Sequence, residues 1–366
     1  MRVVWLTARS MNDLCSTTQV HLVQGLLKNG AEVTFVNADS SIALNHANLS
    51  HIGLPSSTTP GLKARSLGRS MRDYIRQHRN EFSASVVLVE WRVLPYVSTI
   101  LKEYGVPWCL IDRSPPAYGG LLSRLQWPLW KKAWNITKQQ GYPGCVVSKP
   151  HRDFVFKQTG HETSIILDAG VDLALFKPGL QRKVTTMLYH GRLDKNRGVM
   201  ALILLAQKAK SKGLDIHLLM IGEGDAKNHL RNAAKSLSFV EILDQQPIEE
   251  VAKLAGQCHI GLLPMPDQRV WRLASPLKRS EYLGSGLAVF GIDHSGHRLD
   301  ESSHSWFQLA PQSRFHEQGV NFIEDFLASK EEWRVGARNY AETNLSWGAS
   351  IDKLTHVVNE LNQKDS

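Results

Sequence analysis

Cysteine is scarce in this chain: its 366 residues include four, and they lie far apart. No two form a C-x-x-C pair, so the sequence predicts neither a zinc site nor a framework of disulfide bonds. No window approaches the roughly 20 apolar residues of a membrane span. Residues 1–7 are too short an apolar run for a signal peptide. These absences favour a cytoplasmic protein. The cysteines are Cys15, Cys109, Cys145 and Cys258.

Acidic residues are also in short supply. The chain has 34 of them against 43 lysines and arginines, which gives a net charge of +9. A basic chain favours anionic partners, which are nucleic acids, anionic membrane surfaces or phosphorylated substrates. No helix-turn-helix, zinc-finger or aromatic RNA-binding motif is present, and this argues against nucleic acid. A phosphorylated substrate, a membrane surface, or both remain.

Patterns of buried strands alternate with helical patterns along most of the chain. One such run covers residues 2–167 and a second begins at residue 185. The alternation predicts two α/β domains with parallel, Rossmann-like sheets and a ligand cleft between their carboxyl edges. The first strand–helix loop lacks G-x-G-x-x-G, so a dinucleotide is not indicated. Residues 37–65 are polar and predict loops.

The stretch 275–286 has the pattern of a strand leading into a helix. Ser275 is a good N-cap, and Pro276 suits the first helical turn. The N-terminus of such a helix offers backbone N–H groups to an anion, phosphate above all. Lys278 and Glu281 lie three residues apart and share a face, which places Glu281 to accept hydrogen bonds from sugar hydroxyls. The alternative is a plain helix start with a solvated charge at Glu281.

Residues 113–138 contain no acidic residue. Basic side chains alternate there with Trp and Leu, which is the composition of a segment that lies in a membrane interface. A helix packed on the sheet, with its Trp residues in the core, explains the same pattern, and both options stay open. The candidates for contact with an acceptor or a membrane are Arg113, Arg124, Trp127, Trp130, Lys131 and Lys132.

Four short motifs occur in order along the chain. They are residues 170–178, 190–198, 221–225 and 275–286. They resemble, in turn, the linker signature, the diphosphate-holding loop, the loop near the base and the second half of the E-x7-E motif of one family. That family is the large retaining class of GT-B glycosyltransferases called family 4. The amphipathic helix predicted over residues 351–361 is similar to the family's last helix.

The resemblance implies an α/β GT-B fold, in which two Rossmann-like domains face each other across a cleft and the C-terminal helix crosses back to the N-terminal domain. Residues 1–176, with the helix 345–366, would bind the acceptor, and residues 177–344 would bind the nucleotide-sugar donor. The implied activity is retaining transfer of a hexose or related sugar from a nucleotide diphosphate to a hydroxyl group. The basic, Trp-rich segment favours a lipid-linked or cell-envelope glycan as acceptor, as in polysaccharide biosynthesis, and a soluble acceptor is the alternative.

The resemblance also implies roles for single residues. Arg192 and Arg197 would hold both phosphates and stabilise charge on the leaving group. These cations would neutralise the diphosphate in place of a metal ion, so no metal cofactor is expected. The leaving phosphate itself could take the acceptor's proton. Glu223 is explained equally well as a turn residue. The implied donor-binding residues are Gly191, Arg192, Arg197, Glu223, Ser275, Pro276, Leu277, Lys278 and Glu281.

Among the departures from the family, two concern candidate catalytic or sugar-binding positions. Leu273 stands where the first Glu of E-x7-E contacts the donor sugar, so Arg272 or a neighbour substitutes, or sugar recognition differs, or transfer is weak. Asp112 stands where many relatives have a His after the fifth strand. It is a candidate catalytic residue that would assist proton transfer or orient the acceptor, or it simply pairs with Arg113.

Two other functions compete with sugar transfer. A GT-B nucleotide-sugar epimerase would share the cleft, but it needs a pair of carboxylates to deprotonate the sugar ring, and the sequence offers no convincing pair. A nucleotide-sugar-binding protein that has lost catalysis is suggested by Leu273. The expected partners are a nucleotide sugar, a glycan or lipid-linked acceptor and an anionic membrane surface. A peripheral position at the inner face of the membrane is the second option for its location.

Overall fold

The computed structural model describes residues 1–11, 16–59, 61–116, 121–299 and 303–363, so Cys15 lies outside the described residues. The chain divides into two compact units. Unit 1 comprises Met1–Asp168 together with Trp347–Ser366, and unit 2 comprises Ala169–Ser346.

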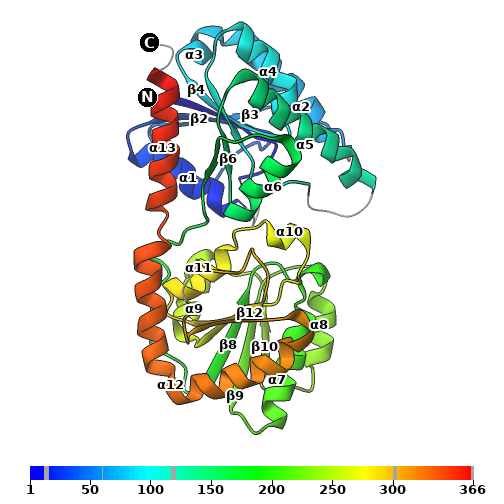
Figure 1. Cartoon of the computed structure of the whole chain (residues 1–366), viewed down its shortest axis with the longest axis vertical. Coiled ribbons are helices and arrows are strands. Elements are labelled where there is room, and N and C mark those ends of the chain that lie inside the picture. The colour runs from blue at the N-terminus through cyan, green and yellow to red at the C-terminus, as the bar shows by residue number, and fades with distance from the viewer. Residues whose placement is uncertain (12–15, 60, 117–120, 300–302, 364–366) are drawn as a thin grey trace. The chain divides into compact units, whose positions relative to one another are not determined.

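In the described part of unit 1, seven parallel strands form a sheet in the order β3-β2-β1-β4-β5-β6-β7 (Figure 1). The order reverses between β1 and β4, which makes the carboxyl ends of these two strands the expected ligand position in an open α/β sheet. The strands are β1 Arg2–Leu6, β2 Glu32–Asn37, β3 Leu49–Gly53, β4 Val86–Glu90, β5 Trp108–Ile111, β6 Gly144–Val146 and β7 Ser164–Ile166.

Helices cover both faces of this sheet, and this explains why its central strands are mostly apolar. In β4, Val87 and Val89 join the core on one face, while Val86 and Leu88 join the core on the other. Alternate residues of a strand point to opposite faces, so a strand buried on both sides reads as a continuous apolar run. The helices are α1 Thr17–Lys28, α2 Lys63–Gln77, α3 Arg79–Ser83, α4 Leu94–Glu103, α5 Leu121–Gln140, α6 Lys149–Thr159 and α13 Gly348–Gln363.

Strand β3 corrects the prediction that residues 37–65 form only loops. It pairs in parallel with β2 and lies at the edge of the sheet. Its sequence, LSHIG, is only partly buried, so it lacks the apolar run that identifies the central strands. An edge strand has one neighbour and one open side, and its sequence signal is correspondingly weak.

The C-terminal helix α13 packs along α1 and so belongs to unit 1, as the resemblance implied. The two helices approach closely at Gly25, where a Cβ atom would lie 2.4 Å from the Ile351 side chain. Asn29 Nδ2 donates a hydrogen bond to Thr355 Oγ1 at 3.1 Å. Four apolar residues predicted for this helix are buried in the unit 1 core: Leu354, Val357, Val358 and Leu361.

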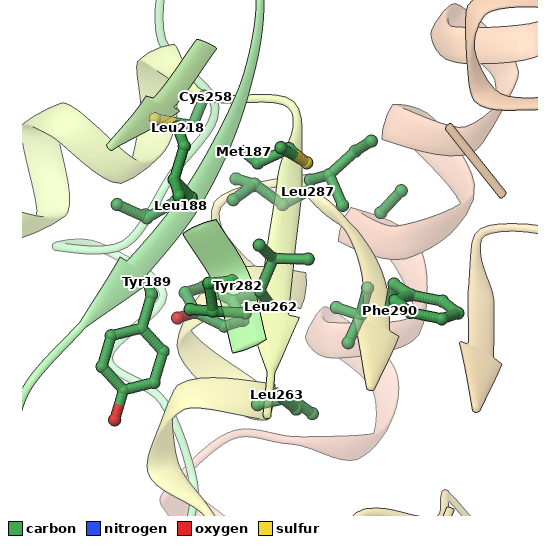
Figure 2. Close-up of a cluster of buried hydrophobic side chains, with 14 of the residues drawn as sticks. Met187, Leu188, Tyr189, Leu218, Cys258, Leu262, Leu263, Tyr282, Leu287 and Phe290 are labelled. Atoms are coloured by element: carbon green, nitrogen blue, oxygen red, sulfur yellow. The ribbon is translucent and has the colours of Figure 1, made fainter. Parts of the chain in front are cut away.

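The sheet of unit 2 repeats the Rossmann-like order, with six described strands arranged as β10-β9-β8-β11-β12-β13. Its core includes Tyr282, whose ring packs so closely on β11 that a Cβ atom at Gly261 would lie 2.2 Å from it (Figure 2). The strands are β8 Thr185–His190, β9 Ile216–Ile221, β10 Val240–Leu243, β11 Ile260–Leu263, β12 Ala288–Ile292 and β13 Phe307–Ala310. The helices are α7 Met200–Ser211, α8 Lys227–Ala234, α9 Ile248–Gln257, α10 Arg269–Arg272, α11 Leu277–Gly284 and α12 Phe315–Asn344.

Two parallel, Rossmann-like sheets were predicted, and this fold class is confirmed. Among the described helices, none combines the length and the apolar composition that crossing a bilayer requires.

Candidate functional site

Two loops meet at the carboxyl edge of the unit 2 sheet, where β8 and β9 end side by side. The Leu193 N–H donates to the Glu223 carbonyl at 2.8 Å, and the Ala226 N–H donates to the Leu193 carbonyl at 2.9 Å. Gly222, with φ of +148°, lies so close to Gly191 that a Cβ there would be 1.8 Å from the Gly191 carbonyl oxygen. The loops that follow β8 and β9 are therefore fixed against each other by their backbones.

Helix α11 brings a lysine to the same place. Gly191 has φ of +109°, and a Cβ atom on it would lie 2.9 Å from both Cε and Nζ of Lys278. The Lys278 ammonium also lies 5.4 Å from the centre of the Tyr189 ring, a cation–π distance. Two predicted donor-binding residues, which lie far apart in the sequence, are thus neighbours at this edge. A side chain at position 191 would displace the ammonium.

The two predicted phosphate-binding arginines share one carboxylate, Asp194. Arg192 donates to it with Nε and Nη2, each at 3.1 Å, and Arg197 Nε lies 3.7 Å from the same group. The Arg197 guanidinium also lies 4.8 Å from the centre of the Trp271 ring. Partial burial favours a higher pKa for Asp194, but hydrogen bonds and charge from Arg192, the Asp225 N–H and Arg197 hold its pKa below the usual range. Asp194 is therefore an anion that orients both arginines.

The start of α11 differs from the prediction. Ser275 is not the N-cap, because Pro276 occupies that position and the helix begins at Leu277. The Ser275 hydroxyl instead accepts a hydrogen bond from the Ala169 N–H at 3.0 Å. Ser280 Oγ donates to the Ala169 carbonyl at 3.1 Å, so these two hydroxyl groups attach the helix to the beginning of unit 2.

Glu281 is buried and faces a residue that the sequence did not suggest. Its Oε2 lies 3.3 Å from Nε2 of His190, the last residue of β8. Burial raises the pKa of Glu281 to about 7, against the opposing charge of Lys278. Burial and the same Lys278 charge lower the pKa of His190 to about 3. Near neutral pH an uncharged imidazole therefore faces a carboxyl group that is partly protonated.

The remaining unit 2 candidates are less closely engaged. Glu223 forms an ion pair with Lys227, and its side chain is 42% exposed. Leu273 is 8% exposed and packs in the protein, so it offers no polar group in place of the missing Glu. Arg272 Nη2 donates to Asp267 at 2.9 Å, which ties this possible substitute to a surface carboxylate.

The structure corrects the catalytic prediction for Asp112 in unit 1. Its side chain is completely buried, and Oδ2 accepts hydrogen bonds from the indole N–H groups of Trp130 at 2.6 Å and Trp134 at 2.9 Å. His151 Nε2 lies 3.3 Å from the same oxygen. Asp112 joins β5, α5 and α6, and its carboxylate is closed to an acceptor.

The basic, Trp-rich segment forms α5. Some of its side chains pack in the core, as expected for a helix on the sheet, and others are exposed, as a membrane or acceptor contact requires. Trp130 belongs to the core, so its assignment to an acceptor or a membrane is wrong. Trp127 is partly buried and packs edge-on against Trp130, with ring centres 5.5 Å apart. The basic candidates Arg124, Lys131 and Lys132 are exposed, whereas Arg113 is partly buried.

A polar cluster lies at the carboxyl edge of the unit 1 sheet, where the strand order reverses. Glu90 ends β4 and accepts hydrogen bonds from the Thr7 hydroxyl at 2.9 Å and the Ala8 N–H at 2.8 Å. Arg9 Nε lies 3.2 Å from Glu90, and Arg92 also pairs with it. Burial favours a higher pKa for Glu90, but Arg92, Arg9 and the two hydrogen bonds lower it. The sequence analysis missed this cluster, although an acidic residue at the end of a buried strand was a usable signal.

Comparisons with solved structures find proteins of the same fold along nearly the whole chain. A sucrose-phosphate synthase from Thermosynechococcus elongatus has a TM-score of 0.79 at 13% identity, with 98% of each chain covered. A glycosyltransferase from Rickettsia africae has a TM-score of 0.75 at 14% identity, again with 98% of each chain covered. HepE from Anabaena, in complex with UDP, has a TM-score of 0.71 at 11% identity and covers 98% of this chain and 99% of its own. At these identities the similarity shows the fold alone.

The fold of these structures is GT-B, and the two Rossmann-like units of this chain share it. Residues 184–317 match the family model described as Glycosyl transferases group 1, which confirms the predicted resemblance over that range. A comparison with curated proteins gives no match. That match covers less than half of the chain, so the comparisons show a GT-B fold whose unit 2 contains a segment similar to the group 1 glycosyltransferases.

Proposed function

We propose that this protein is a retaining enzyme that transfers a sugar from a nucleotide diphosphate, bound by unit 2, to a hydroxyl group of an acceptor bound by unit 1. One observation carries the proposal. Lys278 lies against Gly191 beside the paired arginines Arg192 and Arg197, so three cations from two segments gather at the carboxyl edge of the unit 2 sheet. Cations and a helix N-terminus at such an edge suit a pyrophosphate.

The proposed step breaks the bond between the anomeric carbon and the leaving phosphate oxygen. The acceptor oxygen then bonds to that carbon on the face that the phosphate leaves, and its proton passes to the departing phosphate. Negative charge on the phosphate grows as the bond breaks, and groups aimed at that charge lower the barrier. Arg192, Arg197 and Lys278 would provide this stabilisation, and for that reason we propose that transfer needs no metal cofactor.

Glu281 would accept hydrogen bonds from the ribose hydroxyls, and this role predicts a pH dependence. We assume that only the ionised carboxylate of Glu281 binds the ribose. Because the pKa of this group is about 7, the protonated and non-binding form becomes dominant as the pH falls below 7. Affinity should therefore fall by about tenfold between pH 8 and pH 6. Calorimetric titration with an intact nucleotide sugar, whose phosphate diester groups do not titrate in this range, measures the change.

The matched variant for this test is Glu281→Gln. It should bind the nucleotide sugar more weakly at pH 8 and show a flat profile between pH 6 and pH 8. An unaltered slope in Glu281→Gln would assign the titration to another group and remove Glu281 from the ribose contact.

For the acceptor we propose a cell-envelope or lipid-linked glycan. The exposed basic side chains of α5, Arg124, Lys131 and Lys132, support a surface that attracts anionic lipid or phosphorylated glycan. The cluster of Glu90, Arg9 and Arg92 supports acceptor recognition through hydroxyl and phosphate groups, because it lies where the order of the unit 1 strands reverses.

The burial of Leu273 favours a second candidate function, a nucleotide-sugar-binding protein without catalysis. The two functions give different results with a panel of UDP-, GDP- and ADP-sugars, with uridine first because HepE was solved with UDP. Transferase function predicts saturable binding and slow release of free sugar in the absence of acceptor. Tight binding with no release of sugar supports the binding protein, and conversion of the sugar to its epimer in the absence of acceptor supports an epimerase.

A further inference from the structure

A groove between α2 and α4 in unit 1 is lined by a row of arginines. Its volume is about 500 Å³. Helix α4 forms the other wall, and the two helices lie side by side (Figure 1). At Gly68 of α2 a Cβ atom would lie 2.8 Å from the Tyr96 side chain, so the helices touch beneath the groove. The lining residues are Arg65, Arg69, Arg72 and Arg76 from α2, and Pro95, Tyr96, Thr99, Ile100 and Glu103 from α4.

The helical spacing of the arginines makes the row continuous. They follow one another at intervals of four, three and four residues and therefore share one face of α2, while Leu67, Met71 and Ile75 bury the opposite face. At a rise of 1.5 Å per residue, the row extends over about 16 Å. A ligand with several anionic groups could contact successive guanidinium groups.

The charge of this row is poorly compensated. Asp73 lies 3.2 Å from Arg76 and 3.7 Å from Arg72, on the exposed surface of the helix. Within the described ranges, no carboxylate lies within 4 Å of the Arg65 or Arg69 guanidinium. Like charges three and four residues apart destabilise a helix, so the sequence of α2 works against its own folding at this face. Such a conflict is expected at functional sites.

A second cavity shows that basic lining residues alone are not unusual. It has a volume of about 450 Å³ and lies beside β8, β9 and β10 in unit 2. There two of the three lining lysines and arginines face acids, since Lys210 pairs with Asp215 at 2.8 Å and Arg182 pairs with Glu241 at 3.4 Å. The arginine groove differs in its continuous row of four guanidinium groups, two of which, Arg65 and Arg69, have no carboxylate within 4 Å among the described residues.

We propose that the arginine groove binds a soluble anion that carries several phosphate groups. Guanidinium groups donate two parallel hydrogen bonds to phosphate oxygens, which favours phosphate over a single carboxylate. A concave groove of this volume suits a discrete small molecule, whereas a planar membrane would contact protruding side chains. None of its residues belongs to the proposed donor or acceptor sites, so this ligand is additional to both substrates.

Binding of inorganic tripolyphosphate to the full chain, measured by calorimetry at fixed ionic strength, tests the proposal. Arg65→Gln/Arg69→Gln should weaken one saturable site by about tenfold or more, since both side chains are exposed and their loss removes two charge-assisted contacts. The control is Lys28→Gln/Lys157→Gln, which removes the same charge from exposed positions of unit 1 outside the groove and should change affinity less than about twofold. Circular dichroism verifies that both variants are folded.

Two further measurements separate the groove from other sources of binding. Arg192→Ala/Arg197→Ala should keep the tripolyphosphate site while losing nucleotide-sugar binding, so a failure of the proposed function leaves the groove testable. Vesicles with and without phosphatidylglycerol provide the lipid alternative. The proposal is overturned if tripolyphosphate binding is not saturable, if the lysine control weakens it equally, or if only the anionic vesicles bind in an arginine-dependent manner.

Discussion

Arg197→Ala should lower kcat for sugar transfer by about 10²- to 10³-fold, the range seen when one donor to a developing anion is removed. Arg197 is held in place by Asp194 and by the Trp271 ring, so its guanidinium is positioned before the donor binds. A positioned cation acts on charge that grows during bond breaking, so kcat and kcat/KM should fall together. Initial-rate kinetics with the nucleotide sugar found by the binding panel measure both constants.

Lys195→Ala is the matched control for Arg197→Ala. It removes one positive charge from the same loop, but the side chain is exposed. The hydrogen bonds of Lys195 come from its backbone, whose N–H donates to Asp225 at 2.8 Å and whose carbonyl accepts from the Gly198 N–H at 3.4 Å. We expect less than about a threefold change, since exposed charges act weakly through solvent. Equal rates for Arg197→Ala and the wild-type chain would contradict the assignment of this loop to the pyrophosphate.

Arg192→Ala should have a comparable effect, and the double variant should lose less than the product of the two single losses. Both arginines depend on the same Asp194 carboxylate, and residues that share a partner are not expected to act additively. The measured coupling would show whether the two guanidinium groups act as one anion-binding unit.

The helices and strands that could be predicted are those whose pattern of apolar residues is continuous along the sequence. Central strands such as β4 and β8 are buried on both faces and contain apolar runs, at residues 86–89 and 187–189, that are visible in the sequence. Strands β3 and β13 lie at sheet edges and are only partly buried, so no continuous run of apolar residues identifies them in the sequence. Helix α12 is interrupted at Ser329, where the backbone leaves helical geometry, and this breaks the periodicity that would predict it.

The residues of the candidate site also fall into two groups, those that the sequence predicted and those that only the structure identified. Gly191, the two arginines and Lys278 could be named because they lie in motifs, whose spacing is a property of the chain. His190 and Asp194 lie within the motif 190–198, but the sequence does not show which side chains they contact in the folded chain. Burial of Glu281 against His190 is a tertiary event that only the folded structure reveals.

Asp112→Ala should lower the free energy of unfolding of unit 1 by about 3–5 kcal/mol, the usual cost of breaking a buried charged pair. The completely buried carboxylate accepts the indole N–H groups of Trp130 and Trp134 and faces His151 at 3.3 Å. Alanine would leave these donors buried without an acceptor. Urea denaturation, followed by tryptophan fluorescence, measures the loss, and hydrogen exchange in β5 should locate it in unit 1.

The effect should depend on pH in one direction. Burial alone would raise the pKa of Asp112, but the charge and hydrogen bond of His151 and the indole N–H groups of Trp134 and Trp130 lower it below the usual value. A lowered pKa contributes stability above the unfolded value of about 4, and this stability disappears as pH falls through the folded value. The difference in the free energy of unfolding between Asp112→Ala and the wild-type chain should therefore narrow below about pH 4.

The control variant is Asp153→Ala, on the exposed surface of α6. Its free energy of unfolding should stay within about 0.5 kcal/mol of wild type at each pH, because the ion pair of Asp153 with Arg152 is solvated. A comparable loss in both variants would mean that the indole contacts of Asp112 are not the cause.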